Sequence, residues 1–447
     1  MIGKRAVVVG AGIAGLTSAR ALADDFEHVL ILERDSVPSA ARNRAGIPQG
    51  KHIHVVLGGG QRALEALFPG FVESLATAGA VPVRVASELR VERPGYDPLP
   101  QRDFGWDSYW MSRPLVEHVV RTHVRAMPNV ELRESCRVIE VITGDATSSI
   151  RAVRWTASNG PEETTNADLV IDASGDAAVT LECLRAAGQT APKATTIGVD
   201  LSYSTAIFDI PDDAPAHWKG VYCFPVVPKS GRAALLAPIE GRRWMLTLAG
   251  RGADAPPGDA DGFMAFARSL RTPTIYEAIK NAKRADAVAR FRFPESRYRH
   301  YDAERLPKGL LPVGDAICRF NPIYGQGMSV AAQQACALQT LLRSRRSEPR
   351  PLDSLAPAFF AEADALIDTP WANAAVPDLA YPETRGERPV DLEQRLRFGA
   401  ALLALAAQDA AVHKLVVEVG QLLKPRSVYQ DPELRARVLA VMGTLNK

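Results

Sequence analysis

The first 33 residues contain glycines, an alanine and a glutamate whose types and spacing suit the binding of phosphates and a ribose. In the pattern Gly10-x-Gly12-x-x-Gly15, which includes Ala14, Gly12 lets the backbone approach a pyrophosphate and Gly15 lets a helix pack closely on a strand. A helix that begins here offers free N–H groups to the phosphates. Glu33 ends the next apolar run, where it can accept hydrogen bonds from a ribose diol. The pattern predicts a dinucleotide site and leaves open which dinucleotide binds.

Short runs of residues around these positions predict the elements that place them. The apolar run Arg5–Val9 predicts a central parallel strand, because such strands are apolar on both faces. Leu16–Ala23 predicts a helix, and Val29–Leu32 predicts a second strand that ends at Glu33 and Arg34. These elements follow the order of a dinucleotide-binding unit: strand, glycine turn, helix, strand and acidic residue. We also predict that Arg34, next to Glu33, contacts the dinucleotide.

A second segment whose residues could bind a cofactor lies near residue 315. Residues 310–316 read Leu-Leu-Pro-Val-Gly-Asp-Ala, and residues 320–328 read Phe-Asn-Pro-Ile-Tyr-Gly-Gln-Gly-Met before a helical stretch to about Leu342. A carboxylate such as Asp315 can accept hydrogen bonds from the hydroxyls of a ribityl chain, and glycines let backbone N–H groups approach a flavin carbonyl. The simpler interpretation is a loop-to-helix turn with a capping aspartate.

These two stretches resemble the Gly-Asp signature of the para-hydroxybenzoate hydroxylase superfamily, which includes ubiquinone hydroxylases, squalene epoxidase and flavin halogenases. The resemblance covers about residues 1–345 and implies FAD, with its ADP half on the N-terminal unit. It also implies that Asp315 binds the ribityl chain and that the turn after it lies beside the isoalloxazine ring. The residues of that turn are Pro322, Gly325, Gly327 and Met328.

Two arginines match positions that approach the cofactor in this superfamily. Arg44 lies in the Arg-Asn-Arg-Ala-Gly stretch after the second strand, and Arg113 lies in Ser-Arg-Pro-Leu before a helix. The resemblance implies that both contact FAD. For each arginine alone a solvated surface role is nearly as well supported, because the guanidinium fork binds many partners.

The segment from Asp168 to Asp176 resembles the superfamily's DG fingerprint but departs from it. Asp172-Ala-Ser-Gly175 stands where the hydroxylases carry Gly-Ala-Asp-Gly, a form nearer to halogenases, prenyl reductases and some epoxidases. The electron donor is therefore expected to be NADPH or NADH, acting directly or through a separate flavin reductase. The sequence contains no second complete Gly-x-Gly-x-x-Gly, which disfavours flavoproteins with two dinucleotide domains.

The predicted fold is α/β, with a Rossmann-like FAD-binding domain of the glutathione-reductase type in three layers. We expect this domain at 1–190 and 300–345. An inserted, mostly antiparallel substrate domain is expected at 191–299, with a possible contribution from 83–110, and a helical C-terminal region at 346–447. Within 191–299, β-branched and aromatic runs predict strands at Thr195–Phe208, Gly220–Val227, Ala233–Ile239 and Arg242–Leu248. Asp261–Lys280 predicts a helix broken at Pro273.

Aromatic and apolar side chains of the predicted sheet are candidate walls of a substrate pocket, although an aromatic residue in a sheet more often belongs to the core. These candidates are Tyr203, Tyr222, Phe224 and Trp244, with Phe208 and Met245 as further members. His52 and His54 lie two residues apart without suitably spaced cysteine or carboxylate partners, so we expect a structural or flavin-adjacent role rather than a metal site.

The bulk composition narrows the class of protein. A net charge of +2 gives no reason to expect nucleic acid as a partner. Five scattered cysteines without a CxxC pair predict reduced thiols and no metal site. The longest apolar stretch, Phe398–Ala407, is half the length of a membrane span. No secretory signal precedes Ala6–Val9, so a cytoplasmic protein without an integral membrane span is expected.

The expected reaction is oxygen insertion into an apolar small molecule, by hydroxylation or epoxidation, with O2 as co-substrate. In this superfamily a flavin C4a-hydroperoxide delivers the oxygen, and no side-chain nucleophile is obligatory, so no catalytic residue is assigned.

The partial match of Tyr222-Cys-Phe-Pro225 to a prenyl reductase motif keeps FAD-dependent alkene or prenyl reduction as the alternative. A halogenase is less well supported, because the Trp-x-Trp-x-Ile-Pro segment is absent. A flavin-binding scaffold without turnover is the non-enzymatic alternative. The overall pattern, including Pro48–His54 and Asn321–Met328, resembles bacterial flavin epoxidases and hydroxylases of secondary metabolism. It leaves the substrate and the oligomeric state open.

Overall fold

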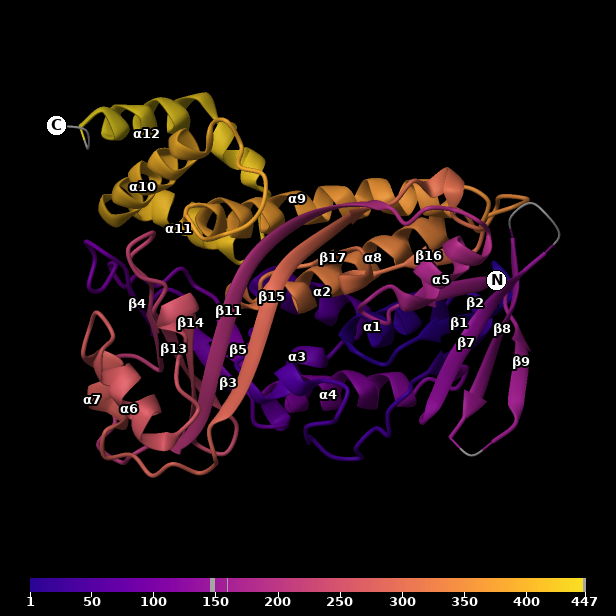
Figure 1. The fold of residues 1–447 in the computed structure, drawn as a ribbon, viewed down its shortest axis with the longest axis horizontal. Coiled ribbons are helices and arrows are strands. Elements are labelled where there is room, and N and C mark those ends of the chain that lie inside the picture. The colour runs from indigo at the N-terminus through magenta and orange to yellow at the C-terminus, as the bar shows by residue number, and fades with distance from the viewer. Residues whose placement is uncertain (145–148, 159, 445–447) are drawn as a thin grey trace.

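The computed structural model of the protein describes residues 1–144, 149–158 and 160–444. One part of the structure is built on a parallel sheet in the order β16-β10-β1-β2-β6 (Figure 1). These strands are β1 Gly3–Val9, β2 Phe26–Leu32, β6 Val130–Arg133, β10 Leu169–Asp172 and β16 Leu310–Pro312. The predicted strand–helix–strand unit is confirmed, with α1 at Ile13–Ala23.

The two faces of this sheet are covered by different elements, which creates the three layers. Ala6 and Val8 of β1 pack into a core with α1 and its neighbouring helices, whereas Val7 and Val9 pack under the β7–β9 sheet. The helices are α2 Gly58–Leu67, α3 Phe71–Thr77, α4 Arg113–Arg125 and α8 Gly327–Ser344. The other face carries β7 Cys136–Thr143, β8 Ile150–Ala157, β9 Glu162–Asn166 and α5 Ala178–Ala186. A sheet buried on both faces explains why β1 is apolar at successive positions.

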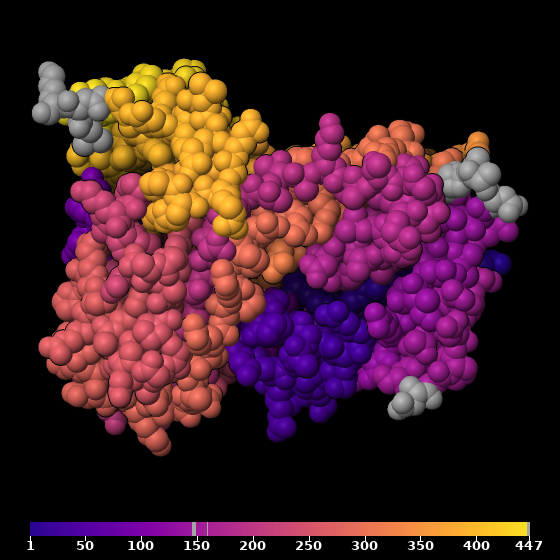
Figure 2. Space-filling model, viewed as in Figure 1, coloured from indigo at the N-terminus to yellow at the C-terminus, as the bar shows by residue number. Residues whose placement is uncertain are grey.

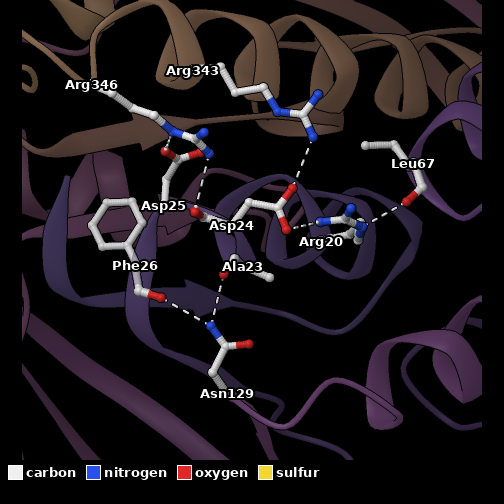
Figure 3. Close-up of polar contacts among 9 residues, drawn as sticks. All are labelled: Arg20, Ala23, Asp24, Asp25, Phe26, Leu67, Asn129, Arg343 and Arg346. Carbon is white, nitrogen blue, oxygen red and sulfur yellow. Dashed lines mark hydrogen bonds and ion pairs between the residues drawn. The ribbon is translucent and has the colours of Figure 1, made fainter. Parts of the chain in front are cut away.

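Ion pairs fasten the end of α8 to the turn between α1 and β2. Figure 3 shows Arg343 reaching Asp24, which also accepts from Arg20, while Arg346 binds the buried Asp25. On the other side of the turn, the Asn129 amide donates to the carbonyl oxygens of residues 23 and 26. The contacts hold together segments that are more than 300 residues apart in the sequence.

A second, larger sheet contains the strands of the predicted substrate domain, in the order β17-β15-β11-β14-β13-β12-β4. Its strands are β4 Leu89–Glu92, β11 Lys193–Asp209, β12 Gly220–Cys223, β13 Ala233–Ile239, β14 Arg243–Arg251, β15 Ala289–His300 and β17 Cys318–Arg319. All neighbours pair antiparallel except β4 and β12, which are parallel. The expected four strands are confirmed, but β12 ends before Pro225 and β15 lay outside the prediction.

One face of this large sheet packs on two short helices, α6 Ala260–Arg268 and α7 Thr274–Ile279, which confirm the predicted helix and its break. The other face points toward the parallel sheet, and the long strands β11 and β15 cross between the two parts (Figure 1). A two-stranded pair, β3 Val81–Arg84 and β5 Asp107–Trp110, packs beside β13. The division into domains at the predicted boundaries stays a prediction.

The C-terminal region is helical, as expected, and has two parts. The long helix α9, Leu355–Leu379, lies along α8 and packs its end on the large sheet. A bundle of α10 Leu392–Gln408, α11 Ala410–Gly420 and α12 Pro432–Thr444 stands beyond it at the chain's end (Figure 1). None of the described helices combines the length and apolar character that a membrane crossing requires.

Candidate functional site

A cavity of about 530 Å³ lies at the carboxyl ends of the parallel strands. Val9 of β1, Leu32 of β2, Ala173 after β10 and Asp315 after β16 all line it. Ligands of open α/β sheets bind at this edge, because the loops and helix N-termini converge there. Figure 2 shows the surface hollowed on this side, between the indigo N-terminal chain and the magenta segment that carries α5.

The glycine turn presents its backbone to this cavity. A Cβ atom built on Gly12 has no described atom within 4 Å, and Gly12 lines the cavity as the residue before α1. The helix has no side-chain cap there, so the first N–H groups of α1 stay available to an anion. Gly15 does not line the cavity. A Cβ on Gly15 would lie 1.9 Å from the Gly10 carbonyl oxygen, so Gly15 permits the close packing of helix on turn.

Glu33 is held at the end of β2 by charge and by backbone hydrogen bonds. Its carboxylate accepts from the backbone N–H of Ala11 at 2.7 Å and of Asp35 at 3.0 Å, and it pairs with Arg44 at 2.9 Å. Burial would raise the pKa of Glu33, but the Arg44 guanidinium and the two N–H groups lower it below its ordinary value. Glu33 is therefore an ionised acceptor on the cavity wall.

The predicted arginines are joined to Glu33 by a chain of alternating charges. Arg44 bonds Glu117 of α4 at 3.1 Å, and Arg113 at the start of the same helix lies 3.6 Å from Glu117. Both arginines line the cavity, and the Nε atom of each is buried without a hydrogen-bond partner among the described residues. Arg34 lines the cavity from an exposed position.

The Gly-Asp segment and the turn after it form the opposite end of the cavity. Asp315 follows β16 and is exposed to the cavity, and Gly327 at the start of α8 lies beside it, since a Cβ there would be 3.7 Å from Asp315 Oδ1. The surrounding cavity walls desolvate this carboxyl group and raise the pKa of Asp315. Arg319 and Arg113 act in the opposite direction.

Nearly all predicted cofactor residues therefore meet in one cavity. Those that line it are Gly10, Gly12, Ala14, Glu33, Arg34, Arg44, Arg113, Asp315, Pro322, Gly325, Gly327 and Met328. The arrangement fits FAD: an uncapped helix start and a glycine without a Cβ neighbour suit the pyrophosphate, and an ionised glutamate suits the ribose. The individual binding roles stay predictions.

The predicted pocket aromatics separate onto the two faces of the large sheet. Tyr203 packs near His52 and Phe291 on the cavity side, and the Tyr222 hydroxyl lies 3.5 Å from the carbonyl oxygen of Ile323 in the turn. Phe224 stacks on Tyr222, with 3.8 Å between ring centroids.

Trp244 requires a correction, because it is 2% exposed in the core under α6 and α7 and stacks on Trp218. Phe208 lies in the same core. Side chains alternate along a strand, so Trp244 and Met245 point to opposite faces, and the structure places Met245 on the cavity side near His54.

His52 and His54 take the two roles that the sequence left open. His52 is buried, with Nδ1 2.7 Å from Thr205 Oγ1, and it docks its segment on the large sheet. His54 lines the cavity, and its Nδ1 lies 3.0 Å from the His52 carbonyl oxygen. A carbonyl oxygen only accepts, so Nδ1 carries the proton and Nε2 stays an acceptor. Burial, aided by the charge of Arg113, lowers the pKa of His54 to about 3 and keeps the ring neutral.

Several residues of the site lay outside the sequence prediction. Phe291 and Phe293 of β15 line the cavity, and no local motif marked that strand. Asp378 of α9 is fully buried and accepts hydrogen bonds from Asn321 at 3.0 Å and Tyr324 at 2.8 Å, and it pairs with Arg251. It fixes the turn that carries Pro322 and Gly325, although it is more than 50 residues away in sequence.

Comparison with known proteins identifies the family. The model of the family described as FAD binding domain matches residues 4–346. The chain belongs to the FAD binding domain family. This match confirms the predicted membership of the para-hydroxybenzoate hydroxylase superfamily, and with it an FAD-dependent oxidoreductase.

Three known proteins are similar to this member of the FAD binding domain family. Protein Rv3254 of Mycobacterium tuberculosis is 32% identical over 403 residues, which are 86% of this chain and 81% of that protein. The flavin-dependent brominase Bmp2 is 16% identical with a TM-score of 0.69, covering 99% of both chains. PqsL of Pseudomonas aeruginosa, described as a probable FAD-dependent monooxygenase, is 18% identical with a TM-score of 0.63, covering 85% of this chain and 97% of PqsL. The two structures share the fold of this chain.

Proposed function

We propose that the protein is a flavin-dependent monooxygenase that hydroxylates or epoxidises an apolar small-molecule biosynthetic intermediate. One oxygen atom of O2 enters the substrate and the other leaves as water, with two electrons from NADPH or NADH. The bound flavin supplies the activation of O2, and the chain supplies binding, orientation and exclusion of water. The donor acts directly or through a separate flavin reductase.

The observation that carries this proposal is the apolar wall at the Asp315 end of the cavity. Val55, Phe291, Phe293 and Met328 line the cavity. Val55 lies beside Gly325 of the turn, and the Phe293 ring lies under Arg319, four residues after Asp315. An oxygenation site must keep water away from its reactive centre, and aromatic and aliphatic walls do so. The neutral His54 adds one hydrogen-bond acceptor without adding a charge.

Two other reactions remain alternatives with weaker support. The brominase Bmp2 shares the fold, but the Trp-x-Trp-x-Ile-Pro segment expected of a halogenase is absent from the sequence. Reduction of an alkene or prenyl group is supported by the partial match of Tyr222–Pro225 to a prenyl reductase motif. Neither alternative needs the O2-dependent insertion of an oxygen atom.

The experiment supplies ¹⁸O2 to chemically reduced holoenzyme with a panel of apolar alkenes and phenols, with and without bromide. A product that gains one ¹⁸O atom supports the monooxygenase. A product formed without O2 that has lost its alkene indicates the reductase, and a brominated product indicates the halogenase. Either of these last two outcomes would replace the proposal.

A further inference from the structure

A cationic side chain without a charge partner lies at the β4 edge of the large sheet. Arg93 directly follows β4, and the Phe224 N–H bonds the Glu92 carbonyl oxygen, which sets Arg93 beside Phe224. The Arg93 guanidinium carbon lies 3.5 Å above the centroid of the Phe224 ring. Stacking of this kind leaves the N–H edge of the guanidinium free to bind an acceptor.

The charge of Arg93 is uncompensated within the described part of the chain. The ionisable groups that act on it are the phenols of Tyr222 and Tyr324, and no described carboxylate pairs with it. Burial lowers the pKa of Arg93, although an arginine stays charged at any physiological pH. The nearby Arg251 differs, because Asp378 pairs with it. A desolvated cation without an anion is unfavourable, so this position favours an anionic ligand.

Two phenols on the same side of the sheet also lack good partners. The Tyr203 hydroxyl is buried and bonds no described residue, and the Tyr222 hydroxyl reaches only the Ile323 carbonyl oxygen at 3.5 Å. Burial raises the pKa of Tyr222 to about 12 and that of Tyr203 well above its ordinary value. Both hydroxyls therefore stay protonated and can donate. Ile323 and Tyr324 lie between Pro322 and Gly325, so the group adjoins the cavity wall.

We propose that Arg93 binds the carboxylate of an acidic, otherwise apolar substrate, with Tyr203 and Tyr222 as neighbouring hydroxyl donors. A planar guanidinium matches a carboxylate with two parallel hydrogen bonds. A single uncompensated cation suits one negative charge, whereas a diphosphate carries several charges. The aromatic rings of Tyr222 and Phe224 suit the apolar body next to that head. This inference rests on the proposed function for calling the ligand a substrate.

The test titrates the holoenzyme with carboxylates and their uncharged amides. Benzoate with benzamide, cinnamate with cinnamamide and decanoate with decanamide cover different shapes, and binding is followed by the flavin absorption spectrum and by calorimetry. At least one carboxylate is expected to bind more tightly than its amide. Equal binding of each pair, or no saturable binding of any carboxylate at millimolar concentration, would overturn the inference.

Variants locate the contact. Arg93→Met keeps an unbranched side chain on Phe224 and is expected to weaken carboxylate binding about ten- to hundredfold while leaving amide binding unchanged. Arg292→Met is the matched control on β15, because that arginine is 74% exposed and faces only Asp200 at 3.4 Å. If the two variants bind carboxylates alike, Arg93 is not the contact. Arg93→Lys keeps the charge but not the fork and should give an intermediate affinity.

Tyr203→Phe separates ligand binding from a structural role. The hydroxyl has no described partner, so its removal should leave the urea midpoint of the holoenzyme unchanged while weakening carboxylate binding. A lowered midpoint with unchanged carboxylate affinity would contradict the assignment of Tyr203. Arg93-dependent carboxylate binding by an enzyme that reduces an alkene without O2, or that brominates its product, would refute the monooxygenase and leave the binding site standing.

Discussion

Gly12 and Gly15 belong to one turn, yet their surroundings differ. Gly12 faces the cavity with extended backbone that any residue can adopt, whereas Gly15 has no space for a side chain. In this motif Gly12 is expected to leave space for the ligand, whereas Gly15 leaves space for the packing of the helix on the turn. A comparison of variants can separate these two requirements.

Gly12→Val is expected to fold normally and to lose FAD, because the new side chain enters the cavity where the pyrophosphate is predicted. Gly15→Val is expected to destabilise the protein by about 1–3 kcal/mol or more, because its Cβ meets backbone. The measurements are flavin absorbance of the purified proteins and urea unfolding of both FAD-free variants. A yellow Gly12→Val protein would show that the pyrophosphate lies elsewhere.

Asp315→Ala is expected to reduce FAD retention by at least tenfold with little change in the stability of the FAD-free protein. The carboxylate is exposed to the cavity, so its removal leaves no buried partner unpaired. FAD content after gel filtration measures the effect, and Asp212→Ala, a 94% exposed carboxylate outside the cavity, is the control. Full FAD loading of the Asp315 variant would refute its assignment to the ribityl chain.

Helix α9 contributes to the site through one carboxylate that lies outside the matched family region. Asp378 neutralises Arg251 and holds Asn321 and Tyr324, so it joins the helix, the large sheet and the turn at Pro322. Helix α9 also packs Ala375 and Leu379 on the face of the large sheet that carries Tyr203.

Asp378→Ala is expected to lower the free energy of unfolding by about 3–5 kcal/mol, because Arg251 would stay buried without its anion. Asp364→Ala is the control on the same helix, since Asp364 accepts only a more exposed hydrogen bond from Tyr298. It should cost about 1 kcal/mol or less. Urea unfolding of the FAD-free proteins measures both, and equal effects would remove the special role of Asp378.

The contact of the His52 loop with the large sheet is expected to weaken at acid pH. Burial lowers the pKa of His52 to about 4, whereas the unfolded chain binds a proton near pH 6.5. Its contribution to stability is complete above pH 6.5. It is lost as the pH falls toward 4, by up to about 1.4 kcal/mol per pH unit. Urea unfolding at pH 7 and pH 5 should show a smaller decrease for His52→Gln, and an identical decrease would exclude this histidine.

The whole molecule encloses the cavity with segments from distant parts of the chain. Residues near 10, 33, 44, 113, 175, 291 and 315 all line it. A ligand that binds only when these segments are assembled stabilises the folded state. FAD should therefore act as a structural element of the entire protein.

Removal of FAD is expected to lower the urea midpoint, and added FAD should restore it in proportion to the logarithm of its concentration. At a hundredfold excess over the dissociation constant, the gain is about 2.7 kcal/mol. Riboflavin, which lacks the ADP half, should stabilise far less, because the predicted contacts of Gly12 and Glu33 are then unused. A midpoint independent of FAD would mean that the cavity is not the FAD site.

Local chemistry was sufficient to predict the elements of the N-terminal unit, and the family resemblance marked the Gly-Asp segment. Their roles depend on residues close together in sequence, such as Gly10 to Glu33, where a strand, a turn and a helix impose the geometry. The four strands between 193 and 251 were also predictable, because β-branched and aromatic runs mark strands wherever they pair.

The remaining parts of the site depend on contacts between distant segments. Whether Trp244 or Met245 faces the cavity follows from the register of β14, and a shift of one residue would exchange them. Asp378 and Arg93 carry no motif, since a carboxylate or a guanidinium gains its role from the partners that packing brings to it or withholds from it. Only the folded chain reveals that Arg251 is paired with a carboxylate and that Arg93 has none among the described residues.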